Sequence, residues 1–173
     1  MRDIIFAIIL GGSVSSGFSG KPAPELMVER IGVPYENNAR ICHRVEPAEV
    51  AGLLPGTLVV NIDGNYWRSY DVDCDAAAKS VTDFYAATEG LPKIMATVPD
   101  RNAGGFYRFF CGAKRSQQVC RASVNDAIRE GCKAGCSLID ADEIYARHAD
   151  EPDIHLTPDI WRAETLRFIG SLQ

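Results

Sequence analysis

The sequence predicts an α/β fold in which helices cover both faces of a parallel β-sheet, and three observations support this prediction. Short apolar runs rich in β-branched residues alternate along the chain with longer segments of helical spacing. The apolar runs are hydrophobic almost throughout, as strands buried on both faces of a parallel sheet are. The chain of 173 residues is long enough to bury its own core and has no internal repeat. We therefore expect one domain that spans residues 1–173.

About five strands are expected, which suits a compact three-layer α/β/α sandwich of flavodoxin-like type. The expected strands are residues 4–10, 26–31, 57–62, 93–98 and 136–139. The second of these has the weakest pattern. The expected helices are residues 38–52, 71–89, 119–133 and a last helix that opens at Thr157-Pro158. Thr157 suits the N-cap of that helix and Pro158 its first position.

The composition is that of an ordinary globular protein, with 46% hydrophobic and 24% charged residues. The formal net charge is −5 and no long basic run occurs, which argues against a nucleic-acid partner. No apolar stretch approaches the roughly 18 to 20 residues that a membrane-spanning helix needs. The oligomeric state has no signature in the sequence.

The N-terminal residues 1–20 allow two interpretations. A charged start followed by an apolar run and small residues is the pattern of a secretory signal. However, Asp3 weakens the positive start, and the run at residues 4–10 is short and rich in β-branched residues, which favours a buried strand. A strand that begins at the N-terminus favours a cytoplasmic protein, and an exported form stays open.

Six cysteines are the other feature that bears on the compartment: Cys42, Cys74, Cys111, Cys120, Cys132 and Cys136. Structural zinc sites usually pair ligands two to four residues apart twice over, and the gap between Cys111 and Cys120 breaks that pattern. No metal site is therefore expected. Buried free thiols, or one or two disulfides in an exported protein, are both compatible with this pattern.

Polar residues that follow the predicted strands are the candidates for chemistry, because ligands bind beyond the carboxyl ends of parallel strands. Gly11, Gly12 and Ser13 follow the first strand. The glycines allow a sharp turn that presents Ser13 near a helix N-terminus, where N–H groups can stabilise an oxyanion. Taken alone, such a turn is more often a connecting loop or a phosphate-binding turn.

Two further segments carry side chains that a hydrolase needs. Asn65 follows the strand at residues 57–62, and its amide could donate to a developing oxyanion. Asp-Gly-Asn also forms ordinary turns readily. His155 lies just before the last helix with Asp153 two residues earlier, which suits a base whose second ring nitrogen is held by an acid. A histidine in such a loop can equally be a surface residue without a role.

Three segments of the chain resemble, in order, the sequence blocks of the SGNH (GDSL-like) hydrolases. LGGSVSSGFSG is similar to the first block, Gly-Asp-Ser-x-(Ser/Thr)-x-Gly, and NIDGNYW to the third block, built around Gly-x-Asn-(Asp). DIHLTP is similar to the terminal Asp-x-x-His block. The three matches span residues 10–158 and follow the strands that the family would require.

The resemblance implies a flavodoxin-like SGNH fold and the hydrolysis of an ester or similar acyl bond, with no metal and no cofactor. By motif matching, Ser13 is the nucleophile and His155 is the general base and then the acid. Asn65 is an oxyanion donor together with the backbone N–H of Ser13. The substrate is expected to be a small-molecule, glycan or lipid ester.

The sequence departs from the family pattern at several positions. Gly12 stands where the family usually has Asp, Asp63 replaces the first glycine of the third block, and Tyr66 replaces its frequent final Asp. The second block is not clear, and a backbone N–H of Gly32 or Tyr35 is a candidate for its oxyanion donor.

The acid is also shifted relative to the family pattern, in which it lies three residues before the histidine. Asp153 is the favoured acid, with Asp150 and Glu151 as the other candidates. A Ser-His dyad assisted by a backbone carbonyl is a further possibility.

Three other functions are compatible with the same residues. An acyl transferase would use the same serine but give the acyl group to an alcohol acceptor. A catalytically inactive binding module would fit the departures from the family pattern, although both nucleophile and base are retained. A flavodoxin-like cofactor binder would use the Gly/Ser turn for a phosphate, but it explains neither Asn65 nor His155.

Overall fold

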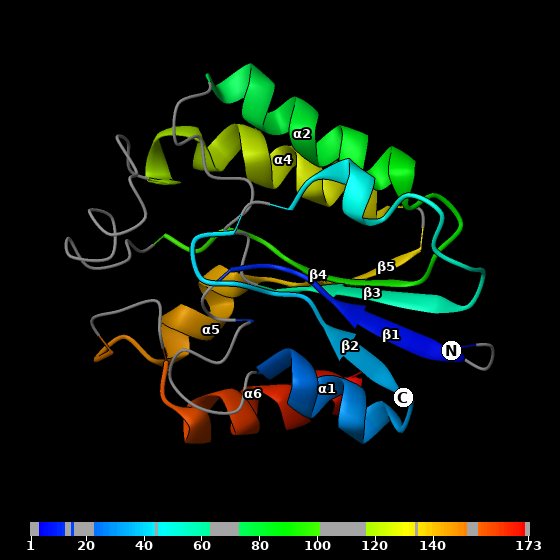
Figure 1. Ribbon diagram of the computed structural model, residues 1–173. Coiled ribbons are helices and arrows are strands. Elements are labelled where there is room, and N and C mark those ends of the chain that lie inside the picture. Colours follow the sequence, from blue (N-terminus) through cyan, green and yellow to red (C-terminus); the bar gives the residue numbers. More distant parts are fainter. Residues whose placement is uncertain are drawn as a thin grey trace.

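The computed structural model describes residues 4–12, 15, 23–43, 45–62, 73–100, 117–133, 135–151 and 156–171. Its centre is a five-stranded sheet in which all neighbouring strands are parallel, in the order β2-β1-β3-β4-β5 (Figure 1). The strands are β1 (Phe6–Ile9), β2 (Tyr35–Asn37), β3 (Thr57–Asn61), β4 (Lys93–Ala96) and β5 (Cys136–Ile139). The predicted α/β class and the expected number of strands are confirmed.

Helices cover both faces of this sheet and make the three predicted layers (Figure 1). The described helices are α1 (Ala23–Ile31), α2 (Cys74–Ala87), α4 (Arg121–Cys132), α5 (Ala141–Arg147) and α6 (Pro158–Ser171), with short 3-10 turns η1 (Pro47–Glu49) and η3 (Gln117–Cys120). Helices α1, α5 and α6 pack on one face of the sheet, and α2 and α4 pack on the other.

The alternation of side chains along β1 shows how the two cores form. Ala7 and Ile9 point into the core shared with α1, α5 and α6, while Ile8 and Leu10 point into the core shared with α2 and α4. Because both faces are buried, the strand needs apolar residues at every position. This explains the hydrophobic run at residues 6–10, whereas Ile5, which precedes the strand, is exposed.

Two of the expected elements are wrong. Residues 26–31 were expected as a strand but belong to α1, where Met27 and Val28 are buried on the helix face that packs against the sheet. Residues 38–52 were expected as a helix, but the described residues of this range form a loop with only the short η1 turn. Cys42 adopts a left-handed φ of 62° and Pro47 cannot continue a helix, so the segment is interrupted twice.

Two elements are absent from the sequence-based expectations. Strand β2 is only three residues long and reads Tyr-Glu-Asn, so it has no apolar run to reveal it. Helix α5 is two turns long and is capped by Asp140, whose side chain accepts from the N–H of Asp142 at 3.0 Å. The remaining strands and helices lie where they were expected, within a few residues at their ends.

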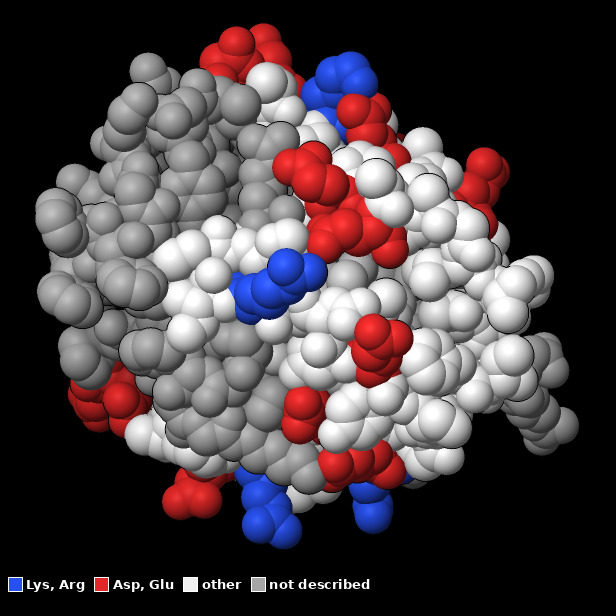
Figure 2. All heavy atoms as spheres, viewed as in Figure 1, with Lys and Arg blue, Asp and Glu red and all other residues white. Residues whose placement is uncertain are grey.

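Charged side chains are spread over the described surface of the face in Figure 2. Acidic groups lie over much of it, and the basic side chains visible there do not gather into a patch. No helix in the part of the chain that the structure describes is long and apolar enough to cross a membrane.

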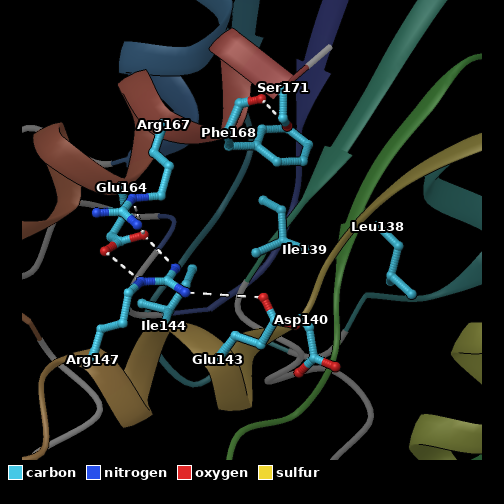
Figure 3. A pocket seen from close by; sticks show the side chains of 10 residues that line it. All are labelled: Leu138, Ile139, Asp140, Glu143, Ile144, Arg147, Glu164, Arg167, Phe168 and Ser171. Carbon is cyan, nitrogen blue, oxygen red and sulfur yellow. Dashed lines mark hydrogen bonds and ion pairs between the residues drawn. The ribbon is translucent and has the colours of Figure 1, made fainter.

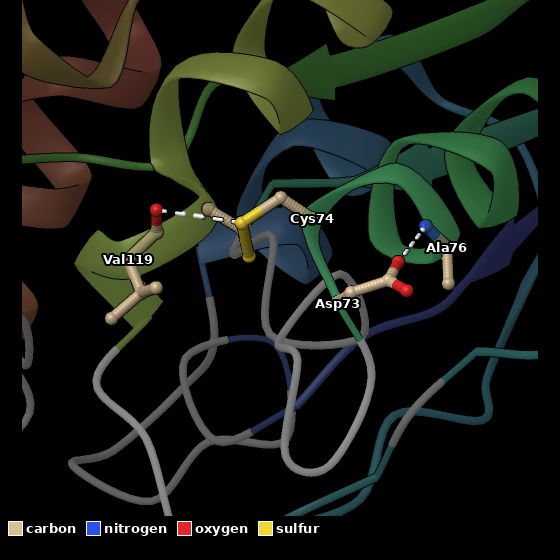
Figure 4. Close-up of a disulfide and its surroundings, with 5 residues drawn as sticks. Asp73, Cys74, Ala76 and Val119 are labelled. Atoms are coloured by element: carbon tan, nitrogen blue, oxygen red, sulfur yellow. Dashed lines mark hydrogen bonds between the residues drawn. A yellow bond between two sulfur atoms is a disulfide. The ribbon is translucent and has the colours of Figure 1, made fainter.

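Disulfides hold both ends of α4. Cys74 at the start of α2 is bonded to Cys120 at the start of α4 (Figure 4), and Cys132 at the end of α4 is bonded to Cys136 at the start of β5. Cys42 is disulfide-bonded as well. Of the two interpretations that the sequence left open, disulfides rather than free thiols are therefore present at all five described cysteines.

Candidate active site

Ser13, Asn65, Asp153 and His155, the four residues predicted to do chemistry, lie outside the described residues. The structure describes the segments on either side of each of them. These segments fix where the chain leaves the sheet before it reaches each predicted residue. The geometry of the site is therefore built from these flanking segments.

The turn that carries Ser13 begins at the centre of the sheet. In the order β2-β1-β3, the chain runs from β1 to one side and then returns to the other, so the carboxyl ends of β1 and β3 flank the topological switch point. The N–H of Leu10 donates to the carbonyl of Val60 at 2.9 Å and holds this end of β1 against β3. Gly11 then adopts a φ of 127°, which a residue with a Cβ rarely does. Gly11 thus uses the conformational freedom for which a glycine was expected at this position, and Ser13 itself lies outside the described residues.

The segment of residues 11–15, here called the serine turn, is tied on both sides of Ser13 to β2 and to the loop that follows β2. The N–H of Arg40 donates to the carbonyl of Gly11 at 3.1 Å, so this loop lies beside the turn. On the other side of Ser13, the amide of Asn37 donates to the carbonyl of Ser15 at 3.1 Å and to Glu25 Oε1 at 2.8 Å. The backbone before and after Ser13 is thus held by fixed partners.

Asn37, which the sequence analysis did not single out, holds the backbone on the far side of Ser13. It ends β2, and its side-chain oxygen also accepts from the N–H of Ala39 at 3.0 Å. The residue could not be identified because the strand that places it beside the serine turn has no apolar pattern.

The suggested second-block donors are in the wrong place. The N–H of Gly32 donates to the carbonyl of Val28 at 3.0 Å and closes the end of α1. Tyr35 is the first residue of β2 and pairs with Ala7, so it lies toward the amino end of the sheet. Both residues lie at the amino end of the sheet, whereas the serine turn lies at its carboxyl end. A backbone donor from this part of the chain would have to come from the loop after β2 instead.

The end of β3, which leads to Asn65, carries an unusual buried group. Asn61 is fully buried, and neither its side-chain nitrogen nor its side-chain oxygen has a hydrogen-bond partner within the described structure. An unsatisfied buried amide costs about 1 to 3 kcal/mol, and such groups call for a functional or structural explanation. Asn61 lies at the carboxyl end of β3, on the same side of the sheet as the serine turn.

Two histidines that the sequence analysis did not single out are paired with carboxylates. His43 Nε2, in the loop after β2, lies 2.8 and 3.0 Å from the two carboxylate oxygens of Glu49. His148 Nε2, at the end of α5, lies 2.9 Å from Glu164 Oε1. Each pair has the His-carboxylate geometry that orients an imidazole, so each must be tested against His155.

The segment that carries Asp153 and His155 runs from α5 to α6 and is anchored at both ends. At its start, Glu164 of α6 accepts from Arg147 Nη2 at 2.6 Å and from Arg147 Nε at 3.2 Å, in addition to its contact with His148. At its end, Leu156 is fully buried in the core between the sheet and α6. The described residues on either side of the segment are therefore held by fixed contacts.

The same cluster borders a cavity of about 370 Å³ beside the outer edge of β5 (Figure 3). Figure 3 shows Arg147 and Glu164 facing each other across the gap between α5 and α6. The hydrogen bonds from Arg147 are the main reason why the pKa of Glu164 is lowered, against the effect of its burial. Glu143, Arg147, Glu164 and Arg167 pair with one another, so we interpret this cluster as a tie between the two helices.

Replacing Glu164 with glutamine is expected to lower the free energy of unfolding by about 2 kcal/mol at neutral pH, because charge-assisted hydrogen bonds to a buried group are lost. Since the pKa of Glu164 is lowered from 4.5 in the folded protein, its stabilising effect is complete above that pH. The effect is lost as the pH falls through the lowered pKa. Urea unfolding of both proteins between pH 3 and 7 measures this difference.

Glu143→Gln is the matched control, because Glu143 lies 3.9 Å from the same Arg147 but its side chain is 74% exposed. The control variant is expected to stay within about 0.5 kcal/mol of the wild type. An equal loss in the two variants, or a Glu164→Gln loss that does not shrink in acid, would contradict the role of the buried carboxylate.

Comparisons with known proteins give a fold but no close sequence relative. No family model matches the sequence, and no curated protein matches it. Among solved structures, the aryl esterase of M. smegmatis superposes with a TM-score of 0.63 at 14% identity, covering 97% of this chain and 98% of that chain.

Two further structures have the same architecture. A carbohydrate acetylesterase from Sinorhizobium meliloti has a TM-score of 0.64 at 14% identity, with 98% of this chain and 100% of that chain covered. A protein assigned as an SGNH hydrolase from Slackia heliotrinireducens has a TM-score of 0.59 at 17% identity, with 98% and 100% covered. At these identities the comparisons establish the fold, and the SGNH-like fold expected from the sequence is confirmed.

Proposed function

We propose that this chain, which has the SGNH hydrolase fold, is a serine hydrolase that cleaves an ester through an acyl-serine intermediate. Ser13 is the nucleophile, His155 is the base and then the acid, and Asp153 orients His155, with Asp150 and Glu151 as the other candidates for that role. Asn65 and the backbone N–H of Ser13 stabilise the oxyanion.

The single observation that carries the proposal is the turn at Gly11. It leaves β1 at the switch point of the sheet, where ligands bind in open α/β folds. The chain reaches Asn65 from the carboxyl end of β3, which pairs with β1 and borders the same switch point. Helix α5 and the first turn of α6 lie toward this end of the sheet, so the segment between them starts and ends near it (Figure 1).

The reaction follows from these roles. Ser13 Oγ attacks the ester carbonyl while His155 accepts the hydroxyl proton, and the oxygen of the substrate becomes an oxyanion. When the bond to the alcohol breaks, His155 gives the proton to the departing alcohol oxygen. A water molecule then attacks the acyl-serine, its proton passes through His155 to Ser13 Oγ, and the carboxylic acid leaves.

Covalent labelling tests the proposal directly. We expect a fluorophosphonate to add to Ser13 and to no other serine of the turn, because only the activated hydroxyl attacks the phosphorus centre. Peptide mapping by mass spectrometry separates Ser13 from Ser15, and Ser13→Ala is the control that must lose the label. Absence of label on the wild type, under conditions that label a known serine esterase, would contradict the proposal. Product analysis with and without an alcohol acceptor then separates hydrolysis from acyl transfer.

A further inference from the structure

A second cavity, of about 410 Å³, lies at the carboxyl end of the sheet and not beside its outer edge. Its lining comes from the chain that follows β4, from the start of α4 and from α5. The lining residues are Asp100, Arg121, Asp142, Tyr145, Ala146 and Ala149. Because β4 and β5 run parallel to β1, this cavity opens at the same end of the sheet as the serine turn.

The polar side of the cavity is fixed by contacts to the backbone. Asn125 both accepts from the N–H of Val98 at 2.7 Å and donates to its carbonyl at 2.9 Å, which clamps the chain where it leaves β4. Arg121 Nε donates to the same carbonyl at 3.1 Å, and its Nη2 donates to Asp142 Oδ2. The N–H of Asp100 donates to the other oxygen of Asp142 at 2.7 Å. These groups are therefore in place before a ligand arrives.

Hydrogen-bonding capacity remains after these contacts are made. Within the described structure, Arg121 Nη1 has no partner, and the exposed carboxylate of Asp100 accepts no hydrogen bond. A ligand can thus meet donors on one side and an acceptor on the other. Ala146 and Ala149 are small and exposed, so they leave room for it beside an apolar surface.

The charges of the cavity select between classes of ligand. Arg121 is neutralised by Asp142, so Asp100 leaves the lining with one net negative charge. An anionic group would be repelled by Asp100, and an ammonium cation has no acceptor to offer the N–H groups of Arg121 Nη1. A neutral group that both donates and accepts hydrogen bonds satisfies both sides, and hydroxyl groups do this.

The distance from the serine turn also limits what the cavity can do. Neighbouring strands lie about 4.8 Å apart, so β4 and β5 lie roughly 10 and 14 Å across the sheet from β1. This is too far for a contact with the reacting carbonyl. It is suitable for a substituent of the same substrate that extends across the end of the sheet.

We propose that this cavity binds the hydroxyl-rich, uncharged half of the ester, a polyol or a sugar, and thereby determines which esters are cleaved. The proposal rests on the proposed function, because it assigns the cavity to the substrate of that site. Asp100 and Arg121 bind the hydroxyl groups, while Ala146 and Ala149 leave space for the carbon skeleton.

Two acetyl esters that differ only in the alcohol test this role. We expect Asp100→Ala, which removes an acceptor, and Ala146→Leu, which fills the cavity, each to lower kcat/KM for a monoacetylated methyl glucoside by about tenfold. The same variants are expected to change kcat/KM for p-nitrophenyl acetate, whose alcohol has no further hydroxyl, by less than about twofold. Ala163→Leu is the control, because Ala163 is exposed on α6 and lines neither cavity.

Binding of methyl glucoside, followed by ligand-observed NMR, separates a failure of the cavity from a failure of the proposed function. If the wild type binds the glucoside, Ala146→Leu does not and neither ester is cleaved, the cavity is a sugar site but the hydrolase assignment, and with it the role of the cavity in choosing esters, falls. If both esters are cleaved but the cavity variants affect them equally or not at all, the cavity assignment is wrong. If the glucoside does not bind and neither ester is cleaved, both are wrong.

Discussion

Replacing either Ser13 or His155 with alanine is expected to lower kcat by on the order of 10⁶-fold on any ester that the wild type cleaves. Nucleophile and base act as a unit, so removing one of them costs nearly as much as removing both. The double variant should therefore be no slower than the single variants by more than a small factor. Initial rates with p-nitrophenyl esters of different chain length, corrected for the uncatalysed reaction, give this comparison.

The two other histidines supply matched controls for the base. His43 and His148 each lie within 3 Å of a glutamate, so each has the orienting partner that a catalytic histidine needs. We expect His43→Ala and His148→Ala to keep kcat within about tenfold of the wild type, provided that the variants are folded. If His43→Ala abolishes turnover while His155→Ala does not, the base is the His43-Glu49 pair, whose loop lies beside the serine turn.

The elements that could be predicted are those whose packing requires a regular pattern of apolar residues in the sequence. Strands β1, β3 and β4 are buried on both faces, and their apolar runs are therefore continuous. Helices α2 and α4 each bury one face against the sheet, so their apolar residues recur at helical spacing. For these elements, local pattern and tertiary environment agree.

The elements that were missed are those whose position depends on distant partners. Strand β2 forms because its backbone pairs with β1, and its Tyr-Glu-Asn sequence carries no trace of that pairing. Residues 26–31 have enough apolar side chains for a strand, but they belong to α1 and take no place in the sheet. A short apolar run does not distinguish a buried strand from a buried helix, and only the tertiary structure decides between them.

The residues of the candidate site also divide into those that the sequence could predict and those that it could not. Gly11 was predictable because a sharp turn after a strand requires a residue without a Cβ, and its φ of 127° agrees with this. Asn37 and Glu164 were not predictable, because their roles come from contacts with Ser15 and with Arg147 and His148 that the chain makes only when folded. Motifs thus identify the groups expected to react, whereas the groups that hold them are found only in the structure.

The disulfides also bear on where the protein folds. Disulfides persist mainly in oxidising compartments. Cys74–Cys120 joins α2 to α4, and Cys132–Cys136 joins α4 to β5. In a reducing environment these elements would be held together by packing only. We therefore expect the oxidised form to be the active one.

Replacing both Cys74 and Cys120 with alanine is expected to lower the free energy of unfolding by about 4 kcal/mol, because the bond closes a loop with a sequence separation of 46. We expect activity to fall as well, even at temperatures where the variant is folded. The bond joins the start of α2, which follows the segment with Asn65, to the start of α4, which carries Arg121. Urea unfolding measures the first effect and kcat/KM the second.

The disulfide between Cys132 and Cys136 is the matched comparison, because it closes a separation of only 4 residues at the other end of the same helix. Its removal is expected to cost about 2 kcal/mol. It should leave kcat/KM nearly unchanged, because the amino end of β5 is far from the serine turn. If the two double variants lose equal stability, loop closure does not account for the difference between them. If the Cys132/Cys136 double variant loses more activity than the Cys74/Cys120 double variant, the reacting groups do not lie at the carboxyl end of the sheet.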